Sequence, residues 1–371
     1  MQPSLGSLTL PAIVTDIDGV LVRQKNPIPG SADAVRFLKT PLQDLDSEKF
    51  GGVNSCLPFV CLTNSGSLTE KQKSESLNHI LSLTESHQLQ EEQVVMCYTP
   101  LRPVLEDYKD KPVMLAGMSN LHALAESFGL KKYITDEEYC IIYPRLVCYR
   151  PKSSPETVQE LKKKIAERLE IANIEELEEP VQAHAIFIVN DPIKWEERIQ
   201  IICDLLTGPD GKIAQKMPKV GPEEHIPVYI TNDDIVYAGK FRLPRIGFGC
   251  FNESLKRIYQ AIYKREPKFN MYGKPEKSTF DYTEKLIRSQ TNAQISNFYM
   301  IGDNPKSDVR GGNNVGWTTI LVKTGVFQQT EVALNDPEDP AKYVVENFNE
   351  AIQLICELEG IKTDYFTKFN N

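Results

Sequence analysis

The stretch AIVTDIDGVLVR, residues 12–23, places two acids, Asp16 and Asp18, one residue apart at the end of an apolar run. Because side chains alternate along a β-strand, the two carboxylates are predicted to point to the same side, with Ile17 opposite. Two carboxylates this close repel each other and raise one pKa unless a cation lies beside them. The stretch therefore predicts a buried strand that ends in an acid pair with a chemical task.

Outward from this stretch, short apolar runs alternate with helical patterns. Strand-like runs occur at 58–66, 111–117, 184–192, 226–234, 298–308 and 317–325. Helical patterns occur at 30–42, 69–83, 119–129, 195–206, 249–266 and 348–360. This alternation predicts an α/β fold with a largely parallel sheet.

Two further segments interrupt the alternation. Residues 155–178 keep apolar residues at helical spacing, which predicts one amphipathic helix with a charged, solvated face. Residues 42–58 are predicted to be a loop insertion between the first helix and the second strand, with Gly51 and Gly52 as breakers.

The composition is that of a globular protein and excludes some functions. The chain has 371 residues, enough for about two domains. A net charge of -9 argues against a nucleic-acid-binding protein, which would carry a basic surface. Eight cysteines without a CxxC pair indicate reduced thiols rather than a disulfide framework.

The sequence leaves the compartment open. No apolar run reaches the length of about 18 residues that a transmembrane helix needs. The first 22 residues contain no Lys or Arg, so they show no clear cleavable presequence. The expected location is mitochondrial or cytoplasmic, with a removed presequence or an internal import signal as the alternatives for mitochondria.

Polar groups follow several of the expected strands, or lie in a loop that can reach the same edge. In chain order they are Asp16 and Asp18, Thr63 and Asn64, the turn Gly273-Lys274-Pro275, and Asp303 with Asp308. Ligands of open parallel sheets bind beyond the carboxyl ends of the strands. Four polar clusters on one edge therefore predict a ligand site there.

The residue types in these clusters suit a phosphate and a hard cation. Asp303 extends the acid pair to a three-acid cluster of the kind that holds Mg²⁺. Lys274 supplies a fixed positive charge for a remaining acid and a transferring phosphoryl group. Thr63 and the backbone N–H groups of TNSG, at the start of a helix, form an anion cradle. Asp308 is also a candidate N-cap of the next helix.

Other conspicuous residues are interpreted as structural. Asp191 and the pair Asp233-Asp234 are predicted to be turn or cap residues, His184 a buried histidine with satisfied hydrogen bonds, and Trp195 and Trp317 packing residues.

Four motifs together resemble those of the haloacid dehalogenase superfamily: TDIDGVL at 15–21, LTNSG at 62–66, YGKP at 272–275 and MIGDNPKSD at 300–308. Their spacing is similar to that of the branch with a large α/β cap between the second and third motifs. The resemblance implies a doubly wound, Rossmann-like core of residues 1–95 and 247–371, with an inserted α/β cap of residues 96–246.

Further segments resemble one family within that branch, the cat eye syndrome critical region protein 5-like hydrolases. They are NPIPGSADAVRFL at 26–38, FIVNDPIKW at 187–195, LPRIGFGCF at 243–251 and GGNNVGWTTILVKTGVF at 311–327. The sequence LTNSGS replaces a frequent Gly-Gly run, and Asn313 stands where a small apolar residue is usual. Neither departure removes a catalytic group.

The resemblance also implies a role for each site residue. Asp16 corresponds to the nucleophile that forms an aspartyl-phosphate, and Asp18 to the acid that protonates the leaving oxygen and then activates water. The phosphate-binding residues are Thr63, Asn64 and Lys274. The Mg²⁺ ligands are Asp16, Asp18 through its main-chain carbonyl, and Asp303, with Asp308 in support.

The expected function is that of a Mg²⁺-dependent phosphatase acting through an aspartyl-phosphate on a small phosphorylated metabolite, because a large cap roofs the site. The alternative is a non-catalytic or weakly catalytic structural subunit of a larger assembly, with mitochondria as one compartment. A homodimer and membership of a larger complex are both open. A dinucleotide-binding dehydrogenase is disfavoured, since no GxGxxG follows the first strand.

Overall fold

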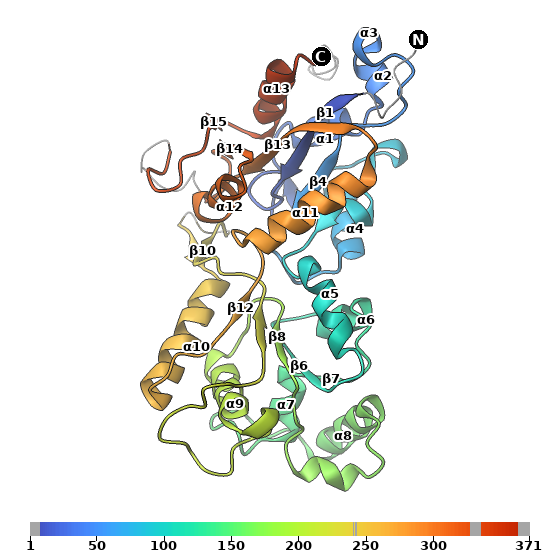
Figure 1. The fold of residues 1–371 in the computed structure, drawn as a ribbon. Helices are drawn as coiled ribbons and strands as arrows, with labels where there is room; N and C mark the ends of the chain where they lie inside the picture. The colour runs from blue at the N-terminus through green and yellow to red at the C-terminus, as the bar shows by residue number, and fades with distance from the viewer. Residues whose placement is uncertain (1–7, 240, 242, 327–334, 363–371) are drawn as a thin grey trace.

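The computed structural model describes residues 8–239, 241, 243–326 and 335–362. The described residues form two lobes, each built on a parallel sheet (Figure 1). The first lobe contains the six-stranded sheet and both ends of the described chain. The second lobe contains a five-stranded sheet. The chain enters this lobe after residue 95, at the end of the last strand of the first half of the six-stranded sheet, and leaves it before helix α11 (Lys277–Gln290).

The sheet of the first lobe has the order β15-β14-β13-β1-β4-β5, and every neighbouring pair is parallel. Its strands are β1 (Thr9–Thr15), β4 (Phe59–Leu62), β5 (Val94–Val95), β13 (Gln294–Gly302), β14 (Thr318–Val322) and β15 (Tyr343–Val345). The chain extends the sheet to one side of β1 first and to the other side later. This doubly wound topology confirms the predicted fold and places its switch point at β1.

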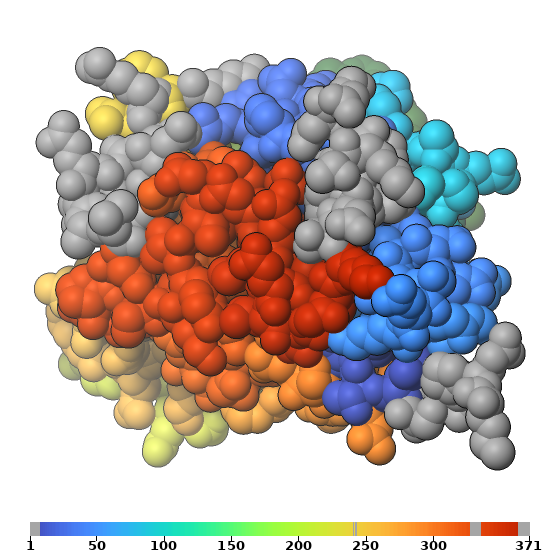
Figure 2. Space-filling view, turned by 90° about the horizontal axis from the view of Figure 1, so that it is seen from above, coloured from blue at the N-terminus to red at the C-terminus, as the bar shows by residue number. Residues whose placement is uncertain are grey.

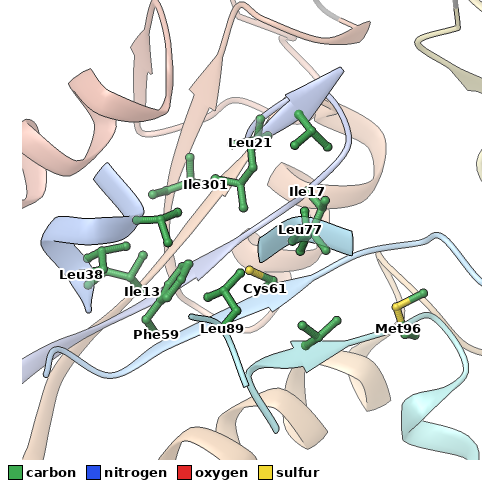
Figure 3. Packing of buried hydrophobic residues seen from close by; sticks show 14 of the residues in the cluster. Ile13, Ile17, Leu21, Leu38, Phe59, Cys61, Leu77, Leu89, Met96 and Ile301 are labelled. Carbon is green, nitrogen blue, oxygen red and sulfur yellow. The ribbon is translucent and has the colours of Figure 1, made fainter. Parts of the chain in front are cut away.

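Strand β1 is apolar from Leu10 to Val14 because helices cover both of its faces. Ile13 packs in one cluster with residues of α1 (Ser31–Leu38), α4 (Glu70–Ile80) and α13 (Phe348–Glu359) (Figure 3). Val14 points the other way and packs in a cluster with Phe280 of α11. Side chains that alternate along this central strand therefore enter two hydrophobic layers, one on each face of the sheet. Because both faces are buried, the run up to Val14 is continuously apolar rather than alternating with polar residues.

The sheet of the second lobe has the order β12-β9-β8-β6-β7 and is also parallel throughout. Its strands are β6 (Val113–Ala116), β7 (Tyr133–Thr135), β8 (Ile186–Ile188), β9 (Val228–Ile230) and β12 (Asn270–Met271). The longer helices of this lobe are α6 (Leu121–Ser127), α7 (Asp136–Ile142), α8 (Pro155–Leu169), α9 (Trp195–Thr207) and α10 (Phe248–Tyr263).

Helix α10 and strand β12 both pack with the second sheet. Phe251, Leu255 and Tyr259 of α10 lie in the hydrophobic cluster of this lobe, and β12 pairs with β9. This packing groups residues 248–271 with the second sheet, beyond the domain boundary expected after residue 246.

Two expected local structures differ from the observed ones. Residues 42–58 contain the short helices α2 (Leu42–Leu45) and α3 (Ser47–Phe50), because Leu42 and Phe50 are buried and Asp46 caps α3. The predicted helix of 155–178 ends at Leu169, where Glu170 adopts a left-handed φ of 57°, and a 3-10 helix follows at Ile174–Glu178.

The remaining elements are short. They are β2 (Val22–Arg23), β3 (Asn26–Pro27), β10 (Val236–Tyr237), β11 (Arg245–Ile246), α5 (Arg102–Leu105), α12 (Arg310–Asn314), 3-10 helices at Glu85–His87, Glu91–Gln93, Thr99–Leu101, Glu106–Tyr108 and Pro209–Gly211, and a π-helical turn at Pro305–Val309. Seen from above, N-terminal segments and the C-terminal third lie side by side on one face (Figure 2). Among the described helices, none combines the length and the apolar character needed to cross a bilayer.

Replacement of Ile13 by Ala tests the central role of β1. Ile13 is fully buried between helices, so Ile13→Ala is expected to lower the free energy of unfolding by about 2–5 kcal/mol. The matched change Ile258→Ala, at a side chain that is 40% exposed on α10, is expected to alter it by about 0.5 kcal/mol or less. Urea unfolding followed by circular dichroism measures both, and equal losses would contradict the assignment.

Candidate active site

The carboxyl ends of the two sheets line one cavity of about 860 Å³. Asp16 and Thr63 reach it directly after β1 and β4, and Asp303 directly after β13. From the second lobe, Asp191 and Asn232 reach it shortly after β8 and β9. Both sheets therefore direct the strand ends at which ligands bind towards the same space.

Lys274 joins the strand ends of the first lobe. Its Nζ lies 2.9 Å from Oδ1 of Asp16 and 2.6 Å from Oδ1 of Asp308, and it donates to the carbonyl of Leu62 at 2.9 Å. Lys274 is 1% exposed. Burial alone would lower the pKa of Lys274, but the attraction of Asp16 and Asp308 outweighs it and raises the pKa. The ammonium is thus held charged inside the protein.

Three carboxylates form a buried cluster beside this lysine. Oxygen atoms of Asp16, Asp303 and Asp308 lie within 4.8 Å of one another. Burial raises the pKa of Asp16 to about 6, although Lys274 opposes this shift, and burial together with the charge of Asp16 raises that of Asp303. The three carboxylates carry more negative charge than Lys274 balances. Carboxylate oxygens are also the ligands that a hard divalent cation prefers.

Backbone groups hold Asp303 and Asp308 in place. Oδ2 of Asp308 accepts from the N–H groups of Asp303 and Asn304 at 3.1 and 3.0 Å, and Oδ2 of Asp303 accepts from the N–H of Val326 at 2.6 Å. Gly19 has a φ of 99°, and a Cβ there would lie 2.5 Å from Oδ2 of Asp303. Glycine is required at this turn, because any side chain would displace Asp303.

Thr63 and Asn64 lie where the second polar cluster was expected, and their side chains make contacts of two different kinds. Oγ1 of Thr63 accepts from the N–H of Ser65 at 3.0 Å, and its side chain lines the cavity. Asn64 holds the backbone of Lys274 at both ends: its Oδ1 accepts from N–H at 2.7 Å, and its Nδ2 donates to the carbonyl at 2.9 Å. In this structure Asn64 therefore positions Lys274.

Asp18 lies at the cavity but outside the carboxylate cluster. Strand β1 ends at Thr15, and the following residues turn, so the side-chain alternation assumed for the acid pair does not extend to Asp18. The Asp18 side chain is 49% exposed, and its Oδ2 pairs with Nζ of Lys73 on α4 at 3.1 Å. The two acids therefore have different environments, one buried beside a lysine and one open to the cavity.

The sequence interpretation missed Asp234 and Lys73. Asp234 is predicted to be a turn or cap residue, yet its Oδ2 accepts from Nδ2 of Asn64 at 2.9 Å and its Oδ1 from Nδ2 of Asn304 at 3.3 Å. Burial raises its pKa to about 6. The strand-end rule, applied to the second sheet, could have found Asp234. No local pattern marks Lys73, which lies on an ordinary helix face.

Most of the other residues interpreted as structural have packing or capping roles. Asp233 accepts from Nδ2 of Asn252 at 3.0 Å, and His184 Nδ1 lies 3.3 Å from the carbonyl of Pro112. Trp317 stacks on Phe298. Trp195 packs against Phe251 as predicted, and both Trp195 and Asp191 also line the cavity.

Comparison with protein-family models matches two segments of the chain. Residues 13–131 match a model described as haloacid dehalogenase-like hydrolase, and residues 271–351 match a second, HAD-hydrolase-like model. The two segments contain Asp16, Thr63, Lys274 and Asp303. They identify the chain as a haloacid dehalogenase-like hydrolase.

Two fungal proteins are similar over most of the chain. A mitochondrial hydrolase of Saccharomyces cerevisiae is 27% identical over 86% of this chain and 88% of its own length. A cardiolipin synthase (CMP-forming)/mitochondrial hydrolase fusion protein of Schizosaccharomyces pombe is 28% identical over 91% of this chain. The chain spans 51% of that fusion protein.

Solved structures of phosphatases share the fold. The p-nitrophenyl phosphatase of Archaeoglobus fulgidus superposes with a TM-score of 0.54 at 14% identity, covering 93% of this chain and 99% of its own. A glycerol phosphate phosphatase of Mycobacterium tuberculosis, in complex with magnesium, superposes with a TM-score of 0.51 at 14% identity, covering 92% and 77%. At identities this low, the superpositions show a shared fold alone.

The raised pKa of Asp234 predicts a pH-dependent effect on stability. The folded pKa of about 6 lies above the unfolded value of about 3.9, so its contribution to stability is present below about pH 4 and is lost as the pH rises through 6. Asp234→Asn carries no charge and does not show this loss. As the pH rises from 4 to 6, its free energy of unfolding is therefore expected to gain roughly 1–3 kcal/mol relative to that of the unsubstituted protein. Urea unfolding across the pH range measures this difference, and a constant difference would contradict it.

Proposed function

We propose that this haloacid dehalogenase-like hydrolase is a Mg²⁺-dependent phosphatase that hydrolyses phosphate monoesters of small metabolites through an aspartyl-phosphate. The observation that carries the proposal is the contact between Asp16 and Lys274, at 2.9 Å, at the edge of the cavity. The ammonium keeps a carboxylate charged in a buried place, where it can act as a nucleophile. Asp18, two residues further on, supplies a second acid that is open to the same cavity.

In the first proposed step Oδ of Asp16 attacks phosphorus and the bond from phosphorus to the leaving oxygen breaks. The electron pair of that bond stays on the leaving oxygen, which takes a proton from Asp18. In the second step Asp18 takes a proton from water, and the water oxygen attacks phosphorus while the bond to Asp16 breaks. The products are an alcohol and inorganic phosphate, and both acids return to their starting states.

The environment of Asp18 suits this proton transfer. Nζ of Lys73 lies 3.1 Å from the carboxylate, half of the Asp18 side chain is exposed, and Asp18 lines the cavity. Thr63 is placed to donate a hydrogen bond to a phosphoryl oxygen, and the charge of Lys274 opposes the negative charge that develops there. Asn64 acts on this arrangement through Lys274, whose backbone it holds.

The carboxylate cluster fits a magnesium ion. Asp16 and Asp303 would hold it, together with the main-chain carbonyl of Asp18 as the family resemblance implies, and Asp308 would support both Lys274 and Asp303. When bound, Mg²⁺ supplies positive charge that neutralises the phosphoryl group and the carboxylates around it. The magnesium complex of the structurally similar glycerol phosphate phosphatase supports this choice of ion.

The finer family placement and the compartment are also proposals. The motifs between 187 and 251 support the cat eye syndrome critical region protein 5-like family. Two relatives are named as mitochondrial hydrolases, which supports a mitochondrial location.

Replacement of the proposed nucleophile tests the reaction. Asp16→Asn cannot form the aspartyl-phosphate, so kcat for p-nitrophenyl phosphate is expected to fall by about a thousandfold or more. The control Asp281→Asn changes an exposed acid on α11 that pairs with Lys277, and it is expected to keep full activity. Release of p-nitrophenol measures both, with circular dichroism to verify folding. Full activity of a folded Asp16→Asn protein would overturn the proposal.

Thermal unfolding tests the metal site without any substrate. Saturating Mg²⁺ is expected to raise Tm by about 5 °C, because it binds the folded cluster and relieves the repulsion among its carboxylates. Asp303→Asn removes one of these charges and is expected to abolish the increase, whereas Asp281→Asn is expected to keep it. An equal increase in all three proteins would place the ion elsewhere.

A further inference from the structure

The wall of the cavity on the side of the second lobe is mostly apolar. Its residues include Met118, Trp195, Val236, Tyr237, Ile246 and Phe248. From this wall, and resting on the proposed phosphatase activity, we infer that the substrate is a phosphate monoester whose leaving group is apolar, an alkyl or aryl alcohol. The wall faces the same space as Asp16, so it lies where a leaving group would extend from a bound phosphoryl group.

The hairpin β10–β11 presents apolar side chains to the cavity without covering them. Val236 pairs with Ile246 across the two strands, and Tyr237 with Arg245. Val236, Tyr237 and Ile246 line the cavity, yet they are 38%, 49% and 69% exposed. Apolar side chains of this size that remain exposed beside a cavity gain free energy when an apolar ligand removes water from them.

The second lobe adds Met118 and Trp195 to the same wall. Met118 follows β6 and is 50% exposed, although its backbone N–H is held by Oδ1 of Asn190 at 2.6 Å. Trp195 begins α9, and its Nε1 donates to the carbonyl of Pro192 at 2.8 Å, while its ring packs edge-on against Phe251. The indole N–H is thereby satisfied within the protein, so the part of Trp195 that a ligand meets is apolar.

Two of the charged groups on this wall, Arg245 and Asp234, have partners within the protein. Nε of Arg245 donates to the carbonyls of Leu243 and Pro244, and its guanidinium lies 4.8 Å from the ring centre of Phe241. The acids on this side are Asp191 and Asp234. Burial raises the pKa of Asp191, and Asp234 accepts from the side-chain amides of Asn64 and Asn304. A sugar or polyol placed against Val236 and Ile246 would leave hydroxyl groups facing apolar side chains, which costs free energy.

The cavity therefore has two chemically distinct ends. Asp16, Asp303 and Lys274 form a charged end suited to the phosphoryl group and its cation, and the hairpin with Met118 and Trp195 forms an apolar end. An alkyl or aryl phosphate matches both ends at once. Glycerol phosphate would match only the charged end.

The inference is tested by three substrates and matched variants of the hairpin. The substrates are n-octyl phosphate, 1-naphthyl phosphate and glycerol 3-phosphate. The variants Tyr237→Ser and Ile246→Ser change the wall. The control Leu243→Ser removes an apolar side chain of the same hairpin that is 50% exposed but does not line the cavity. Because each substrate is compared between proteins, differences in the intrinsic reactivity of the leaving groups cancel.

Tyr237→Ser and Ile246→Ser are each expected to lower kcat/KM about tenfold for the octyl and naphthyl esters and less than about twofold for glycerol 3-phosphate. Leu243→Ser is expected to leave all three within about twofold. A loss confined to the octyl or to the naphthyl ester identifies which kind of apolar leaving group the wall accepts. Equal losses for all three substrates, or equal losses in Leu243→Ser, would overturn the inference.

Two further measurements separate this inference from the proposed function. Binding of n-octylphosphonate, which is not hydrolysed, is measured by calorimetry, and weaker binding to Tyr237→Ser but not to Leu243→Ser is expected even if no ester is turned over. Absence of turnover with intact selective binding would overturn the phosphatase and keep the apolar site. Light scattering gives the oligomeric state, and a change of mass in the hairpin variants without altered selectivity would show that a second copy of the chain covers the hairpin instead.

Discussion

The rest of the site depends on the contacts that the buried ammonium group of Lys274 makes. It connects the ends of three strands of the first sheet, through Asp16 after β1, the carbonyl of Leu62 in β4 and Asp308 after β13. Removing one partner of a buried ion pair typically costs about 3–5 kcal/mol, because the other charge is left uncompensated. Lys274 thus stabilises the carboxyl edge of the sheet, and the same contact favours the charged form of the buried Asp16 carboxylate.

Lys274 also ties the two lobes to each other. The residue follows β12 of the second sheet and precedes α11 of the first lobe. Asn64 of the first lobe holds both backbone groups of Lys274 and also donates to Asp234 of the second lobe. The position of the lysine is therefore determined by contacts from both lobes, so the geometry of the site depends on how they meet.

The arrangement of two parallel sheets explains how so many polar groups come together at one place. Carboxyl ends of parallel strands collect the side chains that cannot lie in the apolar layers, and here two such edges line the same cavity. The buried carboxylates on the first edge create an electrostatic cost that a cation can relieve. The second edge contributes the apolar wall, so the lining of the cavity is divided into a charged part and an apolar part.

Local patterns in the chain determined the doubly wound fold and most of the charged site. Asp16, Asp303 and Lys274 could be predicted because strand periodicity and strand ends are properties of short segments. Such patterns could not determine which of these residues contact one another. The bond between Asp234 and Asn64 joins residues 170 positions apart, and the pair Asp18–Lys73 joins a turn to a helix.

The distinction between local patterns and long-range contacts also explains where two observed segments differ from the predicted ones. The helix predicted over 155–178 has the right spacing, but Glu170 turns the chain and Lys162 then pairs with Glu178 at 2.6 Å. Segment 42–58 forms helices because Leu42 and Phe50 find a core to enter. The sequence by itself thus determined which short segments place charged and polar residues at the ends of strands. The tertiary structure decided which of them meet, since contacts between distant segments depend on packing that no local pattern contains.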